Sequence, residues 1–210
     1  MESRLNIVIP MKAPIRSKQR LMGVLTLSQR ETLASTLFRA TLAFFSENFA
    51  HINRLVVTDS EQIARIAKVY GADVLLEAES TGLNRAIGSA TDWSLSNGYS
   101  HQMVIPADIA KLEVHEVDQI LAAAGNNNDV VIALAKDSGT NALLTTPPNA
   151  IDFCYGKQSG LAHAQEAHKR SLSVEMLHLP SLSQDIDVPD DLLLVSPSYQ
   201  TELTVKGALL

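Results

Sequence analysis

Residues 5–12 read Leu-Asn-Ile-Val-Ile-Pro-Met-Lys, an apolar run that ends at a proline and is followed by a cation. Similar apolar runs recur along the chain, and they are short, largely continuous and rich in Val, Ile and Leu. Such runs are typical of strands that are covered on both faces of a sheet. The predicted strands are residues 5–9, 55–58, 74–76, 103–105, 130–134, 142–144 and 174–179.

Helical patterns fall between most of these runs. Ser28-Gln29-Arg30-Glu31 has the composition of a capping box and predicts the start of a helix whose apolar stripe includes Leu33 and Leu37. Further helices are expected over residues 59–71, 83–97 and 114–124, and after Gly156 and Ser159. The alternation of strands and helices predicts an α/β protein, a single-domain three-layer sandwich with a mostly parallel mixed sheet.

The length and composition suit one domain. The chain has 210 residues, of which 46% are hydrophobic, and this is enough for one full core. We therefore expect a single domain over residues 1–195. The segment 196–210 loses the alternation of strand and helix and is expected to be a tail or an arm at a subunit contact. Its apolar end, Ala208-Leu209-Leu210, is compatible with a homodimer.

Charge and cysteine content exclude several classes of protein. The formal net charge is −6, which argues against a nucleic-acid partner, because binding to a phosphate backbone needs a broad basic face. Cys154 is the only cysteine, so no disulfide framework or thiolate metal cluster is expected. No apolar stretch approaches the ~20 residues that span a bilayer, and the first residues lack the apolar core of a signal peptide. A cytoplasmic protein without a membrane partner is the expectation.

Among the cations that follow the first predicted strand, three are candidates for binding phosphate: Lys12, Lys18 and Arg20. Arg binds phosphate oxygens through two parallel donors and Lys acts as a mobile point charge, so this loop suits a nucleoside triphosphate. On spacing alone, the alternative that these cations are merely solvated is slightly favoured. Neither G-x-x-x-x-G-K-[ST] nor G-x-G-x-x-G occurs near the loop, which argues against a P-loop and against a dinucleotide fold.

Carboxylates form a second candidate group. If the chain is extended at Asp185-Ile186-Asp187, both acidic side chains project to the same side. Asp108 follows another predicted strand and could supply a third oxygen. Oxygen ligands of this kind suit Mg²⁺, which usually completes its shell with water and substrate phosphate. The alternative is that these residues only cap helices and form turns, as the acidic pair Asp190-Asp191 after Pro189 also could.

Two turns and a histidine pair complete the candidates. Gly82-Leu83-Asn84 stands at a helix start, where backbone N–H groups and an amide could contact a base or ribose, although a plain helix cap is the alternative. A hydroxyl at the start of the helix after Gly156 and Ser159 suits an anion. His163 and His168 are five residues apart, which does not place two ligands on one helical face, so no zinc site is expected.

Seven short motifs occur in order along residues 5–195: Ile9-Pro10-Met11-Lys12, Lys18-x-Arg20-Leu21, Gly82-Leu83-Asn84, Pro106-Ala107-Asp108, Gly139-Thr140-Asn141-Ala142-Leu143, Tyr155-Gly156-x-x-Ser159 and Asp185-Ile186-Asp187-x-Pro189. In this order they resemble the 2-phospho-L-lactate guanylyltransferase family, which makes the GMP-linked precursor of the deazaflavin cofactor F420. The family includes enzymes for phosphoenolpyruvate and 3-phospho-D-glycerate. The resemblance covers nearly the whole chain.

The resemblance implies a fold similar to that of nucleotide-diphospho-sugar transferases, with GTP as substrate and Mg²⁺ as cofactor. The residues that it implies for the metal are Asp108, Asp185 and Asp187. Those that would face the triphosphate are Lys12, Lys18 and Arg20. Those that would contact the rest of the nucleotide are Gly82, Asn84 and Pro106. Those that would hold the small phosphorylated carboxylic acid are Thr140, Gly156 and Ser159. In the implied reaction, a phosphate oxygen of the acid attacks the α-phosphorus of GTP and pyrophosphate is released.

The chain departs from the family pattern in three places. After Asp108 the family usually continues with Leu-Pro-Leu, whereas this chain has Ile109-Ala110-Lys111-Leu112. The aromatic residue before Gly156 is usually Phe and is Tyr155 here. The turn that often reads Gly-Pro-Gly-Ser is Gly156-Lys157-Gln158-Ser159, which adds a cation beside the acid site.

These differences leave the acceptor open among 2-phospho-L-lactate, phosphoenolpyruvate and 3-phospho-D-glycerate. They also leave two alternatives for the function. One is a nucleotidyltransferase that uses CTP or UTP with a sugar or alditol phosphate. The other is a catalytically silent nucleotide-binding protein of the same fold.

Overall fold

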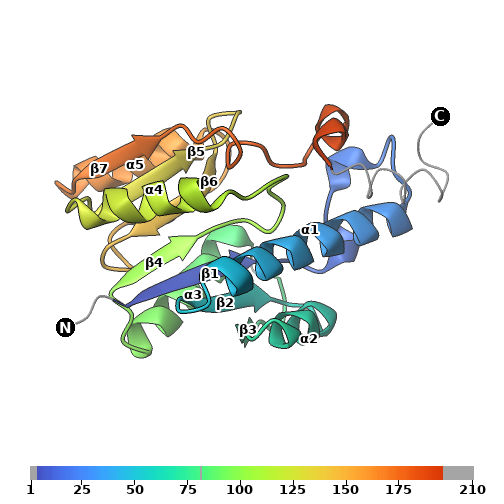
Figure 1. Ribbon diagram of the computed structural model, residues 1–210, viewed down its shortest axis with the longest axis horizontal. Helices are drawn as coiled ribbons and strands as arrows, with labels where there is room; N and C mark the ends of the chain where they lie inside the picture. Colours follow the sequence, from blue (N-terminus) through green and yellow to red (C-terminus); the bar gives the residue numbers. More distant parts are fainter. Residues whose placement is uncertain (1–3, 81, 196–210) are drawn as a thin grey trace.

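The computed structural model describes residues 4–80 and 82–195, and the expected tail at 196–210 lies outside this part (Figure 1). The described residues form one seven-stranded sheet that contains every predicted strand. The strands are β1 (Leu5–Pro10), β2 (Asn53–Thr58), β3 (Asp73–Leu76), β4 (His101–Val104), β5 (Val130–Leu134), β6 (Thr140–Thr145) and β7 (Val174–Leu177). Short 3-10 helices occupy Pro14–Arg16, Gln19–Leu21 and Pro189–Leu194.

The sheet has the order β3-β2-β1-β4-β6-β5-β7. β6 pairs in antiparallel fashion with β4 and β5, and the remaining described strand pairs are parallel. This confirms the mostly parallel mixed sheet. From β1 the chain continues to β2 on one side, and it later returns to β4 on the other side. The carboxyl ends of β1 and β4 therefore flank a topological switch point, which is where open α/β sheets bind ligands.

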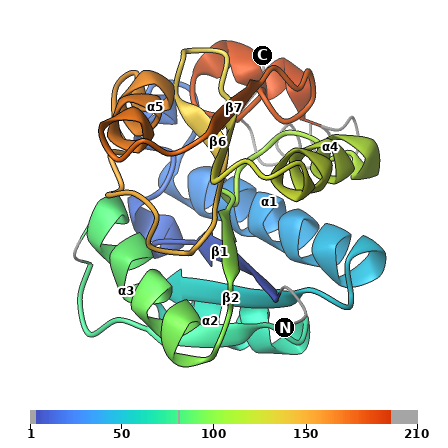
Figure 2. The same cartoon turned by 90° about the vertical axis from the view of Figure 1, so that its left-hand side faces the viewer.

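The helices are α1 (Leu27–Asn48), α2 (Glu61–Val69), α3 (Leu83–Ser96), α4 (Val114–Gly125) and α5 (Ser159–Lys169). In Figure 2 the sheet is seen near its edge, with α3 and α5 on one side and α1 and α4 on the other. Alternate residues of β1 serve the two sides: Ile7 and Ile9 pack with α1, α2 and α4, and Val8 packs with α3. None of the helices in residues 4–80 and 82–195 combines the length and the apolar character that a membrane crossing requires.

The start of α1 differs from the expectation. The capping box is formed by Thr26 and Gln29, and the predicted Ser28 lies inside the helix. Thr26 Oγ1 accepts a hydrogen bond from the Gln29 N–H (3.3 Å), and the Gln29 side chain accepts one from the Thr26 N–H (2.8 Å). Residues 26–29 and residues 28–31 both fit the capping pattern. The buried Leu25 packs in an apolar cluster and holds the chain immediately before Thr26.

A separate apolar cluster ties three distant segments together beyond the end of the sheet. It joins the N-terminal half of α1 to the loop after β1 and to the C-terminal segment around Pro189–Leu194. Figure 1 shows this last segment, in red, beside the blue loop and the first turns of α1. The members of the cluster are Leu21, Leu25, Leu33, Leu37, Ile186, Leu192 and Val195. The cluster brings the segments of Lys18 and Arg20 near those of Asp185 and Asp187.

Glu116 on α4 fixes the loop that leads into the Asp185 segment. Its carboxylate accepts hydrogen bonds from the backbone N–H groups of Ser181 (2.8 Å) and Leu182 (2.7 Å). The side chain is almost completely buried, with 1% exposed. A buried carboxylate needs such donors, because burial of an unpaired charge is costly. The two bonds therefore hold residues 181–182 in one position relative to the sheet.

Glu116→Gln is expected to lower the free energy of unfolding by about 2 kcal/mol, because the amide can accept at one atom only and its NH₂ group faces a backbone donor. Asp118→Asn is the matched control, since it removes the same charge from an exposed position on the same helix. The control is expected to change stability by less than about 0.5 kcal/mol. Urea unfolding of the three proteins measures both values, and equal stabilities of the two variants would contradict the role given to Glu116.

Candidate active site

A cavity of about 530 Å³ opens at the carboxyl ends of β1 and β4. The loops after β1, β2 and β4, the start of α3 and the segment around Asp185 form its walls. β6 contributes its first residue, Thr140, because an antiparallel strand begins at the edge where its parallel neighbours end. The cavity therefore lies at the switch point and collects side chains from segments that are distant in the sequence.

Lys18 projects from the loop after β1 into this cavity. Its backbone is left-handed, with φ of 53°, between the two short 3-10 helices of the loop. The side chain is only 4% exposed, and its Nζ lies 2.5 Å from Asp108 Oδ2. Lys12 also lines the cavity and is exposed, whereas Arg20 is not among the lining residues and is 69% exposed. Two of the three predicted cations therefore lie in the cavity and the third lies outside it.

The loop that carries these cations is anchored on both sides. The Ser17 carbonyl accepts a hydrogen bond from Arg30 Nη1 (3.2 Å), which comes from the first turn of α1. On the other side, the Ala13 N–H donates to the carboxylate of Asp59 (3.2 Å), which also pairs with Arg16. These contacts hold the loop in place, so Lys18 is presented by a fixed backbone.

The three predicted carboxylates come together because two loops pair. Ala110 N–H donates to the Gln184 carbonyl (2.8 Å), and Ile186 N–H donates to the Asp108 carbonyl (3.0 Å). These bonds form an isolated antiparallel bridge between Ile109 and Asp185. All three carboxylate residues, Asp108, Asp185 and Asp187, line the cavity.

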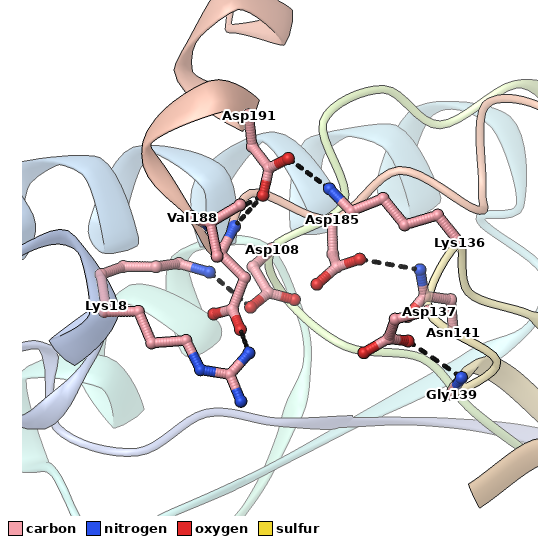
Figure 3. Close-up of polar contacts among 11 residues, drawn as sticks. Lys18, Asp108, Lys136, Asp137, Gly139, Asn141, Asp185, Val188 and Asp191 are labelled. Atoms are coloured by element: carbon pink, nitrogen blue, oxygen red, sulfur yellow. Dashed lines mark hydrogen bonds and ion pairs between the residues drawn. The ribbon is translucent and has the colours of Figure 1, made fainter. Parts of the chain in front are cut away.

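The three carboxylates differ in their partners. Lys18 pairs with Asp108, and Arg20 Nη1 lies 2.7 Å from Asp187 Oδ2. Asp185 lies between Asp108 and Asn141, whose Nδ2 is 3.5 Å from its Oδ1 (Figure 3). Burial raises the pKa of Asp185 above its ordinary value, and the negative charge of Asp108 raises it further. Burial and the neighbouring carboxylates thus both disfavour the charged form of Asp185.

The donor set fits a hard cation in its chemistry. In residues 4–80 and 82–195, no group of three or more His, Cys, Asp and Glu side chains is already arranged to hold a metal ion. Mg²⁺ commonly takes only one or two carboxylates from the protein, with water and substrate phosphate completing its shell. A nearby cation would offset the repulsion between Asp185 and the neighbouring carboxylates. The residues therefore fit a magnesium ion that is shared with a phosphorylated substrate.

Asp191 and Lys136 support this arrangement from behind. Asp191 Oδ2 accepts hydrogen bonds from the N–H groups of Asp187 and Val188, each at 2.8 Å, and Lys136 pairs with its other oxygen (Figure 3). Burial acts to raise the pKa of Asp191, but the bonds from Lys136 and from the two N–H groups lower it overall. Of the two acidic residues after Pro189, Asp191 thus does cap a short helix, and in doing so it fixes the backbone of Asp187.

Thr140 lines another part of the cavity, and the start of α5 packs behind it. Ser159 Oγ donates to Thr140 Oγ1 (3.1 Å), and His163 Nδ1 lies 3.0 Å from the same oxygen. His163 Nε2 accepts a hydrogen bond from the Cys154 N–H (2.9 Å). Of the predicted acid-binding residues, Thr140 lines the cavity, whereas Ser159 lies behind it and the exposed Gly156 is not among the lining residues.

The side of the cavity near α3 holds two of the residues predicted for the nucleotide. Gly82 and Pro106 line the cavity, and Gly82 has φ of 90°, a value that favours glycine. Asn84 is not among the lining residues. Both atoms of its amide bond to the backbone of Tyr155, at 2.8 and 3.2 Å, so it joins α3 to the loop before α5.

Sequence reasoning missed several residues of the site: Asp59, Glu77, Lys136, Asn141, His163 and Asp191. For His163 a signal was present, because it lies four residues after Ser159 and therefore on the same face of α5. Lys136 and Asp191 gave no such signal, since their pairing depends on how two loops meet in the folded chain.

Comparisons with known proteins identify the family. Residues 5–196 match a family described as "Guanylyl transferase CofC like". A 3-phospho-D-glycerate guanylyltransferase from Colwellia psychrerythraea is 49% identical over 201 residues, which cover 94% of this chain and 95% of that protein. A 2-phospho-L-lactate guanylyltransferase from Methanothermobacter thermautotrophicus is 32% identical, with 88% of this chain and 81% of that protein covered.

The fold is shared more widely. The structure of a cytidylyltransferase from Leptospira borgpetersenii superposes with a TM-score of 0.61 over 91% of this chain and 84% of that one, at 14% identity. At that identity the likeness concerns the architecture alone. The family match spans nearly the whole described chain, and the close relatives are guanylyltransferases by name. On this evidence, the chain belongs to the CofC-like guanylyl transferase family and is a nucleotidyltransferase.

Proposed function

We propose that this protein transfers GMP from GTP to the phosphate of 3-phospho-D-glycerate and releases pyrophosphate, which makes the GMP-linked precursor of the deazaflavin cofactor F420. The observation that carries the proposal is the meeting of opposite charges in one cavity, with Lys12 and Lys18 facing Asp108, Asp185 and Asp187. The choice of acceptor rests on the relatives. The 3-phospho-D-glycerate enzyme is 49% identical, and the 2-phospho-L-lactate enzyme is 32% identical.

The cations of the loop after β1 would bind the triphosphate. Lys12 is exposed within the cavity and is the more mobile of the two lining cations. Lys18 is buried and pre-oriented, so it adds positive charge without losing side-chain freedom on binding. Together they would screen the repulsion between the triphosphate and the phosphate of the acceptor.

Asp185 with Asp108 or Asp187 would hold Mg²⁺. When bound, this ion supplies positive charge to the phosphoryl oxygens on which negative charge develops. Lys18 and Arg20 pair with Asp108 and Asp187 and would keep these two carboxylates oriented before the substrates bind. Asp191 would keep Asp187 in register through its two bonds to the backbone.

In the proposed reaction, a phosphate oxygen of the acceptor forms a bond to the α-phosphorus of GTP. The bond from the α-phosphorus to the oxygen bridging it to the β-phosphate breaks, and pyrophosphate leaves with that electron pair. A phosphate monoester loses its second proton with a pKa of about 6, so the nucleophile is ionised near neutral pH and needs no general base. The contribution of the protein is alignment of the two substrates and neutralisation of charge.

The position of Ile109 supports an active enzyme over a silent one. This residue replaces the usual Leu after Asp108, but it is buried, and its backbone takes part in the bridge to Asp185. Because the backbone makes the bridge, an apolar side chain of similar size can occupy the position without moving Asp108. The replacement of Leu by Ile109 therefore leaves the carboxylate arrangement intact, and Ala110 supplies a backbone N–H to the bridge that the usual proline would lack.

The acceptor and the nucleotide can be tested together. The purified protein is incubated with Mg²⁺ and with GTP, CTP or UTP, in the presence of an equimolar mixture of 3-phospho-D-glycerate, phosphoenolpyruvate and 2-phospho-L-lactate. We expect the GMP adduct of 3-phospho-D-glycerate as the main product by mass spectrometry, together with stoichiometric pyrophosphate. A sugar phosphate serves as the control acceptor, and preferential turnover of it with CTP or UTP would refute the proposal.

Asp185→Asn is expected to reduce kcat by a few hundred-fold, as the loss of a transition-state contact worth about 3–4 kcal/mol implies. The unfolding free energy is expected to stay equal or to rise, because the substitution removes a half-buried charge beside two like charges. Asp190→Asn is the matched control, since it makes the same change at an exposed position in the same segment. Full Mg²⁺-dependent turnover by Asp185→Asn would show that this carboxylate does not hold the metal.

A further inference from the structure

A chain of hydrogen bonds runs behind Thr140, the residue of the cavity lining that is predicted to bind the acid. It links the Cys154 N–H to His163, His163 to Thr140, and Ser159 to the same threonine oxygen. The distances are 2.9, 3.0 and 3.1 Å. Ser159 and His163 are one turn apart on α5, so both face the first residue of β6. Both are buried, with 2% and 0% exposed.

The Cys154 N–H determines which nitrogen of His163 carries the proton. A backbone N–H can only donate, so Nε2 must be the unprotonated acceptor. Burial lowers the pKa of His163 to about 4, so the ring is neutral near pH 7 and has a single N–H. That N–H is therefore at Nδ1, where it donates to Thr140 Oγ1. The ring of Tyr155 packs edge-on against the imidazole, with centroids 4.8 Å apart, and fixes its plane.

Thr140 Oγ1 then has both lone pairs in use. It accepts one hydrogen bond from His163, and it accepts one from Ser159 because that serine is buried and its hydroxyl has no other acceptor within residues 4–80 and 82–195. A hydroxyl has one proton and two lone pairs, so its remaining capacity is donation. Within residues 4–80 and 82–195, no hydrogen bond donated by this hydroxyl is present. Thr140 is 8% exposed, and the cavity is the open space that it lines.

We propose that His163 and Ser159 are positioning residues that direct the Thr140 proton into the cavity, so that Thr140 is an obligate hydrogen-bond donor to an anionic oxygen of the acceptor. The inference rests on the proposed function for the identity of that ligand. Because the Thr140 hydroxyl can donate but no longer accept, it favours a ligand oxygen with free lone pairs. Hydrogen bonds to charged oxygens are the stronger ones. The acceptor offers two such groups, a carboxylate and a phosphate.

The proton position in the unmodified protein is the first test. In full-length protein labelled with ¹⁵N-histidine, we expect His163 to show a protonated Nδ1 and an unprotonated Nε2 at pH 7. The resonance is assigned by its absence in His163→Gln. Protonation at Nε2, or an equal mixture of tautomers, would overturn the inference. This test needs no substrate, so it separates failure of the inference from failure of the proposed guanylyl transfer.

Kinetics of a double-mutant cycle provide the second test. His163→Phe and Thr140→Val are each expected to raise KM for 3-phospho-D-glycerate about tenfold or more, as the loss of a bond to a charged oxygen implies, with kcat and KM for GTP largely unchanged. The double variant is expected to match Thr140→Val alone, because His163 acts through the threonine. His168→Phe is the control at an exposed position of the same helix. If the effects of the two substitutions on KM for 3-phospho-D-glycerate multiplied, or if kcat and both KM values changed in parallel, His163 would have only a structural role. Either result would overturn the inference.

Two further variants guard against a folding defect. Thr140→Ser and His163→Gln retain a hydroxyl and a donor–acceptor pair, and both are expected to restore most of the affinity for the acceptor. Competitive inhibition by glycerol 3-phosphate, which lacks the carboxylate, distinguishes the two anionic groups. An unchanged inhibition constant in Thr140→Val assigns the bond to the carboxylate, and a raised constant assigns it to the phosphate. Loss of affinity for the acceptor in Thr140→Ser equal to that in Thr140→Val would contradict the donor role.

Discussion

The site depends on a short antiparallel contact between two loops that are far apart in the sequence. Two backbone hydrogen bonds, from Ala110 to Gln184 and from Ile186 to Asp108, place one carboxylate-bearing loop against the other. Backbone bonds are insensitive to side-chain identity, and their direction fixes which side chains share a face. The supporting contacts from Glu116 and Asp191 act on the same loop, one before Asp185 and one after Asp187. The carboxylates are thus held by main-chain geometry rather than by contacts with one another.

Such a concentration of negative charge would be unstable without counter-charges. Lys18 and Arg20 supply them, and the two cations differ in exposure, with Lys18 buried and Arg20 on the surface. An exposed pair contributes little to stability, whereas a buried cation beside a carboxylate is strongly constrained. Under the proposed function, Lys18 and Asp108 would each gain a new partner when triphosphate and Mg²⁺ bind. The ion pair between them would then act as a placeholder that keeps both groups oriented in the free protein.

The sequence predicted the fold well because continuous apolar runs leave few alternatives to buried strands. Every strand was found, and the error at the start of α1 arose where Thr26 and Ser28 both fit the same capping pattern. The site was harder to predict from the sequence. Asp108 and Asp185 could be proposed as a group from the motif order, but the bridge that joins them is a tertiary contact. Asn84 shows the limit most clearly, because a residue expected to contact the nucleotide instead bonds to the backbone of Tyr155.

The departures from the family pattern fall on two parts of the site with different tolerances. Ile109 lies within the bridge, where the backbone does the work and the side chain needs only to be apolar. Lys157 lies just before α5, exposed and two residues before Ser159, whose hydroxyl bonds to Thr140. Under the proposed function, a cation added there would change the field near the acceptor without contact with the carboxylates. Variation around Thr140 and the start of α5 would then bear on which phospho-acid is bound, whereas the reaction itself would depend on the loops after β1 and β4 and on the Asp185 segment.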